Sequence, residues 1–251
     1  MKGIILAAGR GSRMGVVTND LPKCQIAVAG KTLLDWQLSS LKSAGISQVA
    51  VVTGYKSNYL QSPLYETFHN PRWNETNMLV SLMTADSWLS QFPCIISYAD
   101  ILYHPDIVRS LCNDSEHITI TYDLMWESLW RLRFSNPLSD AETFKVDDRN
   151  YLVTIGQRTQ CISEIQGQYM GLIKTTPDSW QVIKELILEL TPKQLDRLDM
   201  TGMFAGLLER CCPIKAIAIS GRWCEIDSSN DLFVYENMIR SHKAWTHDWR
   251  E

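Results

Sequence analysis

Glycine, arginine and lysine residues near the start of the chain have the spacing of a phosphate-binding loop. The apolar run Ile4–Leu6 leads into the segment AAGRGSR at residues 7–13, and Lys23 follows ten residues after Arg13. Glycine lacks a Cβ and adopts positive φ readily, so backbone N–H groups at such a turn approach an anion closely. Arg13 and Lys23 would add positive charge. The residues predicted to bind phosphate groups are Leu6, Ala7, Ala8, Gly9, Gly11, Ser12, Arg13 and Lys23.

Two better-known phosphate-binding loops do not fit this segment. The dinucleotide fingerprint needs a third glycine or alanine where the chain has Met14, and the Walker loop needs a glycine where it has Gln25, five residues before Gly30. The structural alternative is an ordinary glycine-rich connection between a strand and a helix, with Arg13 and Lys23 merely solvated.

Two aspartates follow predicted strands and could hold a divalent cation. Asp100 ends the apolar run that begins at Ile95, and Asp227 lies between a strand near 215–219 and the last predicted helix. Mg²⁺ prefers hard oxygen ligands and usually takes one or two protein carboxylates. The spacing alone is equally compatible with Asp227 as the N-cap of that helix. Glu225 is a weaker third ligand.

Polar residues lie just before a predicted helix at about 77–90 and could hydrogen-bond a ligand. Asn77 and Ser81 are four residues apart and share a helix face, and Thr76 precedes them. Amide and hydroxyl groups have the donors and acceptors needed to read the edge of a pyrimidine. The alternative is that Thr76 simply caps the helix.

Aromatic, acidic and basic residues are concentrated in an insertion at about 124–170. Tryptophan faces attract ammonium groups, carboxylates pair with them, and an arginine can clamp a carboxylate or phosphate, so the insertion is predicted to bind a small zwitterion. The alternative is that the aromatic residues belong to the core. The candidate residues for binding this zwitterion, the acceptor of any group transfer, are Trp126, Trp130, Arg133, Asp140, Glu142 and Tyr169, together with Trp223 outside the insertion.

The order of the elements predicts a single α/β domain over residues 1–251. Strands and helices alternate, which favours a mostly parallel central sheet with helices on both faces, Rossmann-like, and ligands at the carboxyl ends of the strands. Strands are expected at about 3–7, 48–53, 94–98, 117–122, 169–174 and 215–219, and helices at about 32–44, 77–90, 105–112, 178–190 and 228–240. A β-hairpin of 143–146 and 151–155 would form a lid or wall at the site. The tail, 241–251, is expected to be a helical end packed on the body or on a second copy in a homodimer.

Composition restricts the partners of the chain. Its 251 residues are 45% hydrophobic and carry a net charge of −4, which argues against a broad surface for nucleic acid or anionic membrane. Seven cysteines without a C-x-x-C pair fit reduced thiols. Because the chain has no apolar run of about 18 residues and no leader-like start, a soluble, cytoplasmic protein is expected.

The N-terminal motif resembles the signature of nucleotidyltransferases that make activated sugars and alcohols, L-A-x-G-x-G-x-R followed by P-K. Further segments resemble the phosphocholine-type cytidylyltransferases, and the run Thr76-Asn77-Met78 resembles the cytidine-using members. These segments are W-x-x-x-W-x-x-R-F from Trp126, D-A-E-T from Asp140, Q-Y-M-G-L from Gln168 and W-C-E-I-D from Trp223. The resemblance implies a nucleotidyltransferase fold and Mg²⁺ held by Asp100 and Asp227, with Arg13 and Lys23 as further catalytic residues.

The resemblance also implies the reaction. CMP would pass from CTP to a small phosphorylated zwitterion of the phosphoglutamine kind, in the modification of a bacterial surface polysaccharide; phosphocholine, phosphoethanolamine and 2-aminoethylphosphonate are the alternative acceptors. Lys23 would bridge the α-phosphate and the acceptor. A metal-dependent glycosyltransferase would explain Asp100 but not Arg13 with Lys23, and a non-catalytic nucleotide-binding regulatory module is the alternative from another class.

Overall fold

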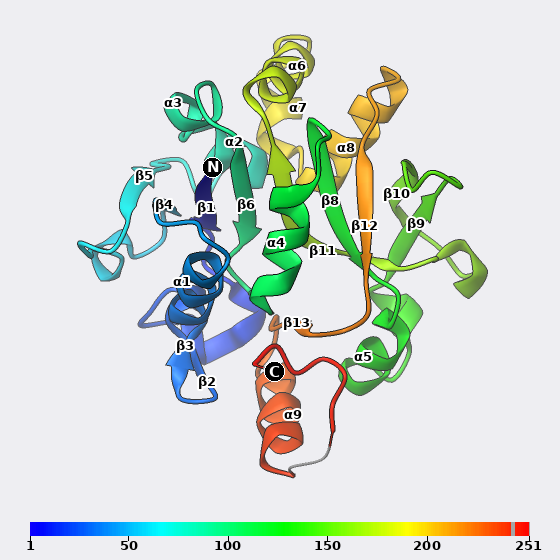
Figure 1. Ribbon diagram of the computed structural model, residues 1–251. Coiled ribbons are helices and arrows are strands. Elements are labelled where there is room, and N and C mark those ends of the chain that lie inside the picture. Colours follow the sequence, from blue (N-terminus) through cyan, green and yellow to red (C-terminus); the bar gives the residue numbers. More distant parts are fainter. Residues whose placement is uncertain (242–243, 251) are drawn as a thin grey trace.

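A seven-stranded sheet forms the centre of the computed structural model, which describes residues 1–241 and 244–250 (Figure 1). The strand order is β12-β8-β11-β6-β1-β4-β5, and only β11 runs antiparallel to its neighbours. The mostly parallel sheet is therefore confirmed. Its strands are β1 (Lys2–Ala7), β4 (Val49–Thr53), β5 (Glu66–His69), β6 (Cys94–Tyr98), β8 (Ile118–Asp123), β11 (Gln168–Thr175) and β12 (Lys215–Ile219).

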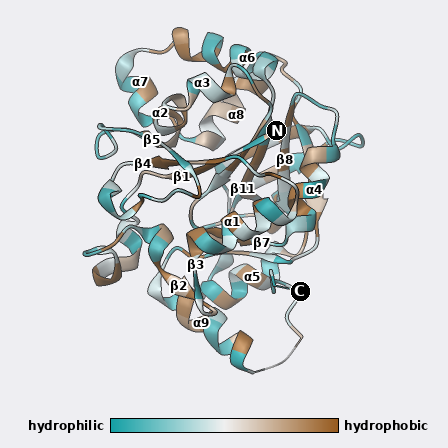
Figure 2. Ribbon diagram, turned by 60° about the vertical axis from the view of Figure 1, so that its left-hand side comes forward, coloured by the Kyte–Doolittle hydropathy of each residue, from teal (hydrophilic) through white to brown (hydrophobic). Residues whose placement is uncertain are grey.

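Helices cover both faces of the sheet, as predicted. Alternate residues of β1 enter different cores: Ile5 packs with α1 and α4, whereas Ile4 and Leu6 pack with α2, α3, α6 and α8. Burial on both sides explains why the central strands β1, β4 and β6 are largely apolar (Figure 2). The helices are α1 (Leu33–Ser43), α2 (Met78–Met83), α3 (Asp86–Leu89), α4 (Pro105–Asn113), α5 (Trp126–Arg133), α6 (Pro177–Leu188), α7 (Pro192–Arg197), α8 (Met200–Glu209) and α9 (Ser229–Arg240).

Three short two-stranded sheets lie outside the central sheet. The predicted hairpin is present as β9 (Glu142–Val146) and β10 (Leu152–Arg158), and β2 (Ala27–Val28) pairs with β3 (Lys31–Thr32). The third pairs β7 (Ile101–Tyr103) with β13 (Trp223–Glu225), which are far apart in sequence. This pairing joins the end of β6 to the segment after β12. Short 3₁₀ turns lie at Ser12–Thr18, Lys23–Gln25, Ser57–Tyr59, Pro137–Ser139 and Ile162–Glu164.

Several predicted elements need correction. The helix expected at about 77–90 is broken into α2 and α3, and α5, α7, α8 and the edge strand β5 were not predicted. The tail is not a helical end where it is described, since residues 244–250 form turns; residues 242, 243 and 251 lie outside the described part. Trp249 packs against Trp36 of the same chain, with ring centroids 5.9 Å apart. No helix within 1–241 or 244–250 is long and apolar enough to cross a membrane.

Candidate active site

The glycine-rich turn after β1 brings its backbone against the side chain of Lys23. Gly11 has φ 70° and ψ 49°, in the left-handed region. A Cβ on Gly11 would lie 2.7 Å from Cδ and 2.8 Å from Cβ of Lys23. Glycine is therefore required twice at this position, by the backbone conformation and by the close approach of Lys23.

Gly11→Ala is expected to lower the free energy of unfolding by at least about 1–2 kcal/mol, because alanine is strained in the left-handed region and its methyl group would displace Lys23. Chemical denaturation followed by circular dichroism measures this loss. Gly9→Ala is the matched control, since a Cβ at Gly9 would meet no atom within 4 Å. Equal unfolding midpoints for the two variants would contradict the interpretation.

Lys23 is buried and holds two carboxylates together. Its Nζ lies 2.8 Å from Oδ2 of Asp100 and 2.6 Å from Oδ1 of Asp227. Burial alone would lower the pKa of the ammonium group, but the charges of the two aspartates and the hydrogen bonds to them outweigh burial and raise it. Lys23 is therefore a fixed positive charge, and the alternative of a merely solvated lysine is wrong.

Asp227 does not cap the last helix. The N-cap of α9 is Ser228, whose side chain accepts a hydrogen bond from the backbone N–H of Asp231. The carboxylate of Asp227 instead pairs with Lys23 and, at 3.0 Å, with Nη1 of Arg13. Burial opposes ionisation of Asp227, but the neighbouring cations hold its pKa well below the ordinary value. The capping alternative is therefore wrong, and Asp227 is a charged acid at the site.

Three acids converge where β7 and β13 pair. One carboxylate oxygen from each of Asp100, Glu225 and Asp227 lies within 4.8 Å of the others. The backbone N–H of Ile226 donates to the carbonyl of Asp100 at 2.9 Å and so fixes the two segments side by side. Oδ1 of Asp100 is buried and has no hydrogen-bond partner among the described residues. An orphaned carboxylate oxygen beside two further acids fits a hard divalent cation such as Mg²⁺.

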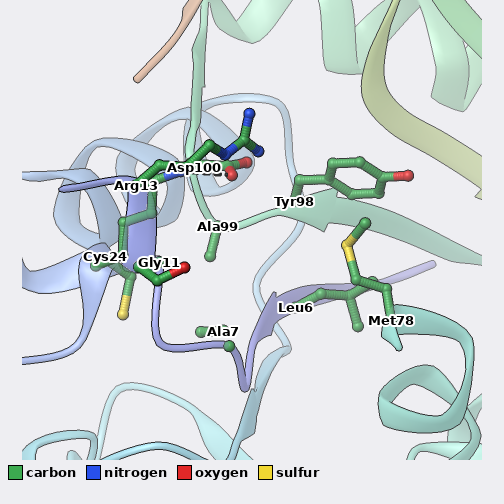
Figure 3. Close-up of a pocket in the computed structure, with 12 residues that line it drawn as sticks. Leu6, Ala7, Gly11, Arg13, Cys24, Met78, Tyr98, Ala99 and Asp100 are labelled. Carbon is green, nitrogen blue, oxygen red and sulfur yellow. Dashed lines mark hydrogen bonds and ion pairs between the residues drawn. The ribbon is translucent and has the colours of Figure 1, made fainter. Parts of the chain in front are cut away.

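A cavity of about 280 Å³ opens over the glycine-rich turn (Figure 3). Figure 3 shows Arg13 and Asp100 together at one side of it and Tyr98 and Met78 at the other. Leu6, Ala7, Gly9, Gly11, Ser12, Arg13, Lys23 and Asp100 all line this cavity, so the structure brings most of the predicted phosphate-binding residues together. Ala8 does not line it; its carbonyl accepts a hydrogen bond from the backbone N–H of Tyr55.

Two of the residues predicted to read the base, Thr76 and Ser81, belong to a polar network around Asn70. Nδ2 of Asn70 donates to the hydroxyls of Thr76 and Ser81, both at 3.0 Å, and Ser81 is buried. Asn77, not Thr76, caps α2, so the capping role was assigned to the wrong residue. None of Thr76, Asn77 and Ser81 lines the cavity, whereas Met78 does. Asn70 was missed, although Asn-Pro is a turn signal in the sequence.

A second cavity, of about 310 Å³, adjoins the first and shares Arg13, Met78 and Tyr98 with it. Four predicted acceptor-binding residues line it: Trp130, Asp140, Glu142 and Tyr169. Nε1 of Trp130 donates to Oδ2 of Asp140 at 3.1 Å. Burial raises the pKa of Glu142, and nearby Asp199 and Asp140 add to this while Arg158 opposes it.

The other three predicted acceptor-binding residues do not line the second cavity, and the prediction needs correction for them. Trp126 and Trp223 are buried in the hydrophobic core, where the alternative interpretation placed the aromatic residues. The side chain of Arg133 is 0% exposed and is hydrogen-bonded to acids of the same chain. Arg133 is therefore not free to clamp an acceptor.

Sequence reasoning missed other residues of the second cavity. Arg158 ends β10, and Asp199 and Thr201 lie at the start of α8. Asp199 caps α8 by accepting from the backbone N–H of Gly202 at 2.7 Å, and an aspartate before a helix is a recognisable capping signal. Arg158 had no local signal, because its position depends on the pairing of β9 with β10.

Comparison with known proteins finds relatives that transfer nucleotidyl groups. Residues 3–126 match the model of the MobA-like NTP transferase domain. The chain is 38% identical over 253 residues to a CTP:phosphoglutamine cytidylyltransferase of Campylobacter jejuni, an alignment that covers 93% of this chain and 98% of the relative. It is 29% identical to a choline-phosphate cytidylyltransferase of Haemophilus influenzae over 48% of this chain and 52% of the relative.

Solved structures share the whole fold. The inositol-1-phosphate CTP transferase of T. maritima superposes with a TM-score of 0.76 at 18% identity, covering 97% of this chain and 98% of that one. The CTP:phosphocholine cytidylyltransferase of Streptococcus pneumoniae superposes with a TM-score of 0.73 at 19% identity, covering 95% and 98%. Both comparisons show that the overall fold is shared along nearly the whole chain.

Proposed function

Because the chain belongs to the nucleotidyltransferase family, and within it to the cytidylyltransferases, we propose that it transfers CMP from CTP to a small phosphorylated zwitterion of the phosphoglutamine kind and releases pyrophosphate. The observation that carries this proposal is the junction of the two cavities. One is lined by the glycine-rich turn, the other carries charges of both signs, and both include Arg13. Two anionic substrates could meet at this junction.

In the proposed reaction, an oxygen of the acceptor phosphate attacks the α-phosphorus of CTP. A new P–O bond forms, the bond from the α-phosphorus to the bridging oxygen of the β-phosphate breaks, and pyrophosphate leaves. The ionised acceptor oxygen is already a nucleophile at neutral pH, so no residue has to remove a proton. Catalysis then depends on holding two anions in line and on neutralising their charge.

The residues divide this work by their positions. Backbone N–H groups of the turn at Gly9, Gly11 and Ser12, with Arg13, would hold the β- and γ-phosphates. Lys23 remains charged and lies between Asp100 and Asp227, where the α-phosphate and the acceptor would approach each other.

Asp100 and Asp227, with Glu225 as a weaker third ligand, would hold Mg²⁺. When bound, the ion would supply positive charge to the phosphate oxygens. Burial and the charge of Asp227 raise the pKa of Glu225, which makes it the least available of the three carboxylates.

The second cavity favours an acceptor that carries both an ammonium and a carboxylate group. Asp140, Glu142 and Asp199 could surround the former, and Arg158 could face the latter. A quaternary ammonium would depend on aromatic faces, and two of the tryptophans expected to supply them lie in the core. The nucleotide-activated product would suit attachment to a bacterial surface polysaccharide, and CTP as substrate suits a cytoplasmic enzyme. We also propose that two copies of the chain can form a homodimer.

Pyrophosphate release from CTP and Mg²⁺ tests the proposal with phosphoglutamine, phosphocholine, phosphoethanolamine and 2-aminoethylphosphonate in parallel. We expect phosphoglutamine to have the highest kcat/KM, and UTP, ATP and GTP to support little release. Turnover of phosphocholine with phosphoglutamine inert would overturn the proposed acceptor but not cytidylyl transfer. No release with any acceptor would favour a glycosyltransferase or a non-catalytic nucleotide-binding protein.

Glu142→Gln is expected to raise KM for phosphoglutamine about tenfold or more and to leave KM for CTP unchanged, since it removes a charge that would pair with the ammonium group. The raised pKa of Glu142 gives a second readout. As the pH falls through that value, the carboxylate takes up a proton, so KM for the acceptor should rise in the wild type earlier than for an ordinary glutamate. The variant should lack this rise.

The matched control for this variant is Glu127→Gln on α5, because Glu127 pairs with the exposed Arg131 outside both cavities. An unchanged acceptor KM in Glu142→Gln would show that the ammonium group does not contact this residue.

A further inference from the structure

Arg133 is surrounded by acids at the end of β13 and just after it. Its Nη1 donates to Oε2 of Glu225 at 2.9 Å and its Nε to Oδ1 of Asp231 at 3.0 Å. Its Nη2 lies 3.4 Å from Oδ2 of Asp227 and from Oδ2 of Asp231. Burial alone would lower the pKa of the guanidinium, but the charges of Glu225 and Asp231 outweigh burial and raise it, so Arg133 stays charged although none of its side chain is exposed.

Asp231 continues the network from Arg133 to the backbone. Its Oδ2 accepts the N–H groups of Asp227 and Ser228, both at 2.8 Å, and its carboxylate is buried. Asp231 therefore fixes the chain at Asp227, while Arg133 fixes Asp231 and the side chains of Glu225 and Asp227. Neither Arg133 nor Asp231 lines either of the two cavities.

We propose that Arg133 and Asp231 form a clamp that positions Glu225 and Asp227 to bind the divalent cation. This inference rests on the metal site of the proposed function. Both are positioning residues, since they act through other side chains and do not face the substrates. The planar guanidinium suits this task because its N–H groups have a fixed geometry that can engage several carboxylates at once.

Positioning and simple electrostatics predict opposite effects on cation binding. A positive charge beside the carboxylates repels a divalent cation, so if charge alone mattered, losing Arg133 would strengthen binding. If Arg133 holds the ligands in place, losing its geometry weakens binding. Arg133→Lys separates the two effects, because lysine keeps the charge, but its single nitrogen cannot reproduce the four contacts that the guanidinium makes with three carboxylates.

The experiment measures Mn²⁺ binding to the full-length protein by electron paramagnetic resonance of the free ion, without turnover. We expect Arg133→Lys to raise the Kd for Mn²⁺ about 10–100-fold, as is common when a residue that orients a metal ligand is lost. Arg131→Lys is the matched control, two residues away on α5, where the arginine is 61% exposed and pairs with Glu127. Its Kd should equal that of the wild type.

A kinetic readout distinguishes this role from the earlier expectation for Arg133. For Arg133→Lys, the Mg²⁺ concentration at half-maximal activity should rise, while KM for the acceptor at saturating Mg²⁺ stays unchanged. A change confined to acceptor KM would overturn the clamp, as would wild-type Mn²⁺ affinity in a folded Arg133→Lys protein.

Asp231→Asn tests the same clamp from α9 if Arg133→Lys does not unfold cooperatively. The amide has one acceptor oxygen in place of two and turns a donor toward Arg133 or the backbone. We again expect weaker Mn²⁺ binding, and wild-type affinity would overturn the proposal. Loss of folding in both variants would assign the network to the fold alone. A wild-type protein that binds no Mn²⁺ would overturn the metal site itself, which separates the two failures.

Discussion

Lys23→Ala is expected to lower kcat by about a hundredfold to a thousandfold, the effect typical of losing a preorganised group that stabilises charge in the transition state. Lys23 contacts both Asp100 and Asp227 and lines the cavity over the glycine-rich turn. Its charge would matter most when two anionic substrates approach each other, so kcat should fall more than KM for CTP rises. Steady-state pyrophosphate release at saturating CTP and acceptor measures the loss.

Stability must be measured beside activity for this variant. Removing the lysine leaves the buried Asp227 and the half-buried Asp100 without their shared partner. Breaking a fully buried ion pair commonly costs about 3–5 kcal/mol, so the partial exposure of Asp100 should make the loss smaller. Activity is therefore compared well below the unfolding midpoint found by circular dichroism. Lys42→Ala, at an exposed position in the last turn of α1, is the matched control and should keep wild-type turnover. A folded Lys23→Ala protein with most of its turnover intact would contradict the assignment.

The parts of the site that could be predicted are those with local causes. The glycine-rich turn follows a buried apolar strand, and both the strand and the turn are visible within the first 13 residues. Asp100 could be placed at the edge of the sheet because a carboxylate after an apolar run marks the end of a buried strand. Such signals depend on neighbouring residues, and tertiary packing does not reverse them.

The parts that local patterns left open depend on long-range pairing. Glu225 and Asp227 reach Asp100 because β13 pairs with β7, whose residues lie more than a hundred positions earlier. Spacing alone therefore could not decide whether Asp227 caps a helix or joins Asp100. Arg133 shows the same limit: an arginine in a helix is usually exposed. It is buried here because acids 92 to 98 residues later enclose it. No local pattern distinguishes that arginine from one that binds a substrate.

Which aromatic residues face the second cavity and which lie in the core also depends on tertiary packing. Trp126 and Trp130 are one helical turn apart on α5, with ring centroids 6.1 Å apart. Only Trp130 reaches the second cavity, where its indole N–H finds Asp140. Composition alone cannot show which aromatic side chain faces a ligand, because both positions lie on an apolar helix face.

Asp227→Asn is expected to reduce kcat about a hundredfold or more while α9 stays folded. The amide keeps the size of the side chain and one oxygen, but it removes the charge that pairs with Lys23 and Arg13 and that would attract a hard cation. Because Ser228 is the helix cap, the circular dichroism spectrum should be unchanged. Asp148→Asn, at an exposed turn between β9 and β10, is the control. Wild-type kcat and Mg²⁺ dependence in Asp227→Asn would show that Asp227 has no role in the reaction.

The double variant Asp100→Asn/Asp227→Asn gives the sharper result. If the two acids hold one cation, either single change already disables the site, and the second change adds little. Two independent roles would instead multiply the losses. The shared contact with Lys23 would couple the pair even without a cation, so the comparison is repeated in the Lys23→Ala background. Coupling between Asp100 and Asp227 that persists there, in proteins that unfold cooperatively, would identify the cation as its source; coupling that disappears would assign it to the lysine.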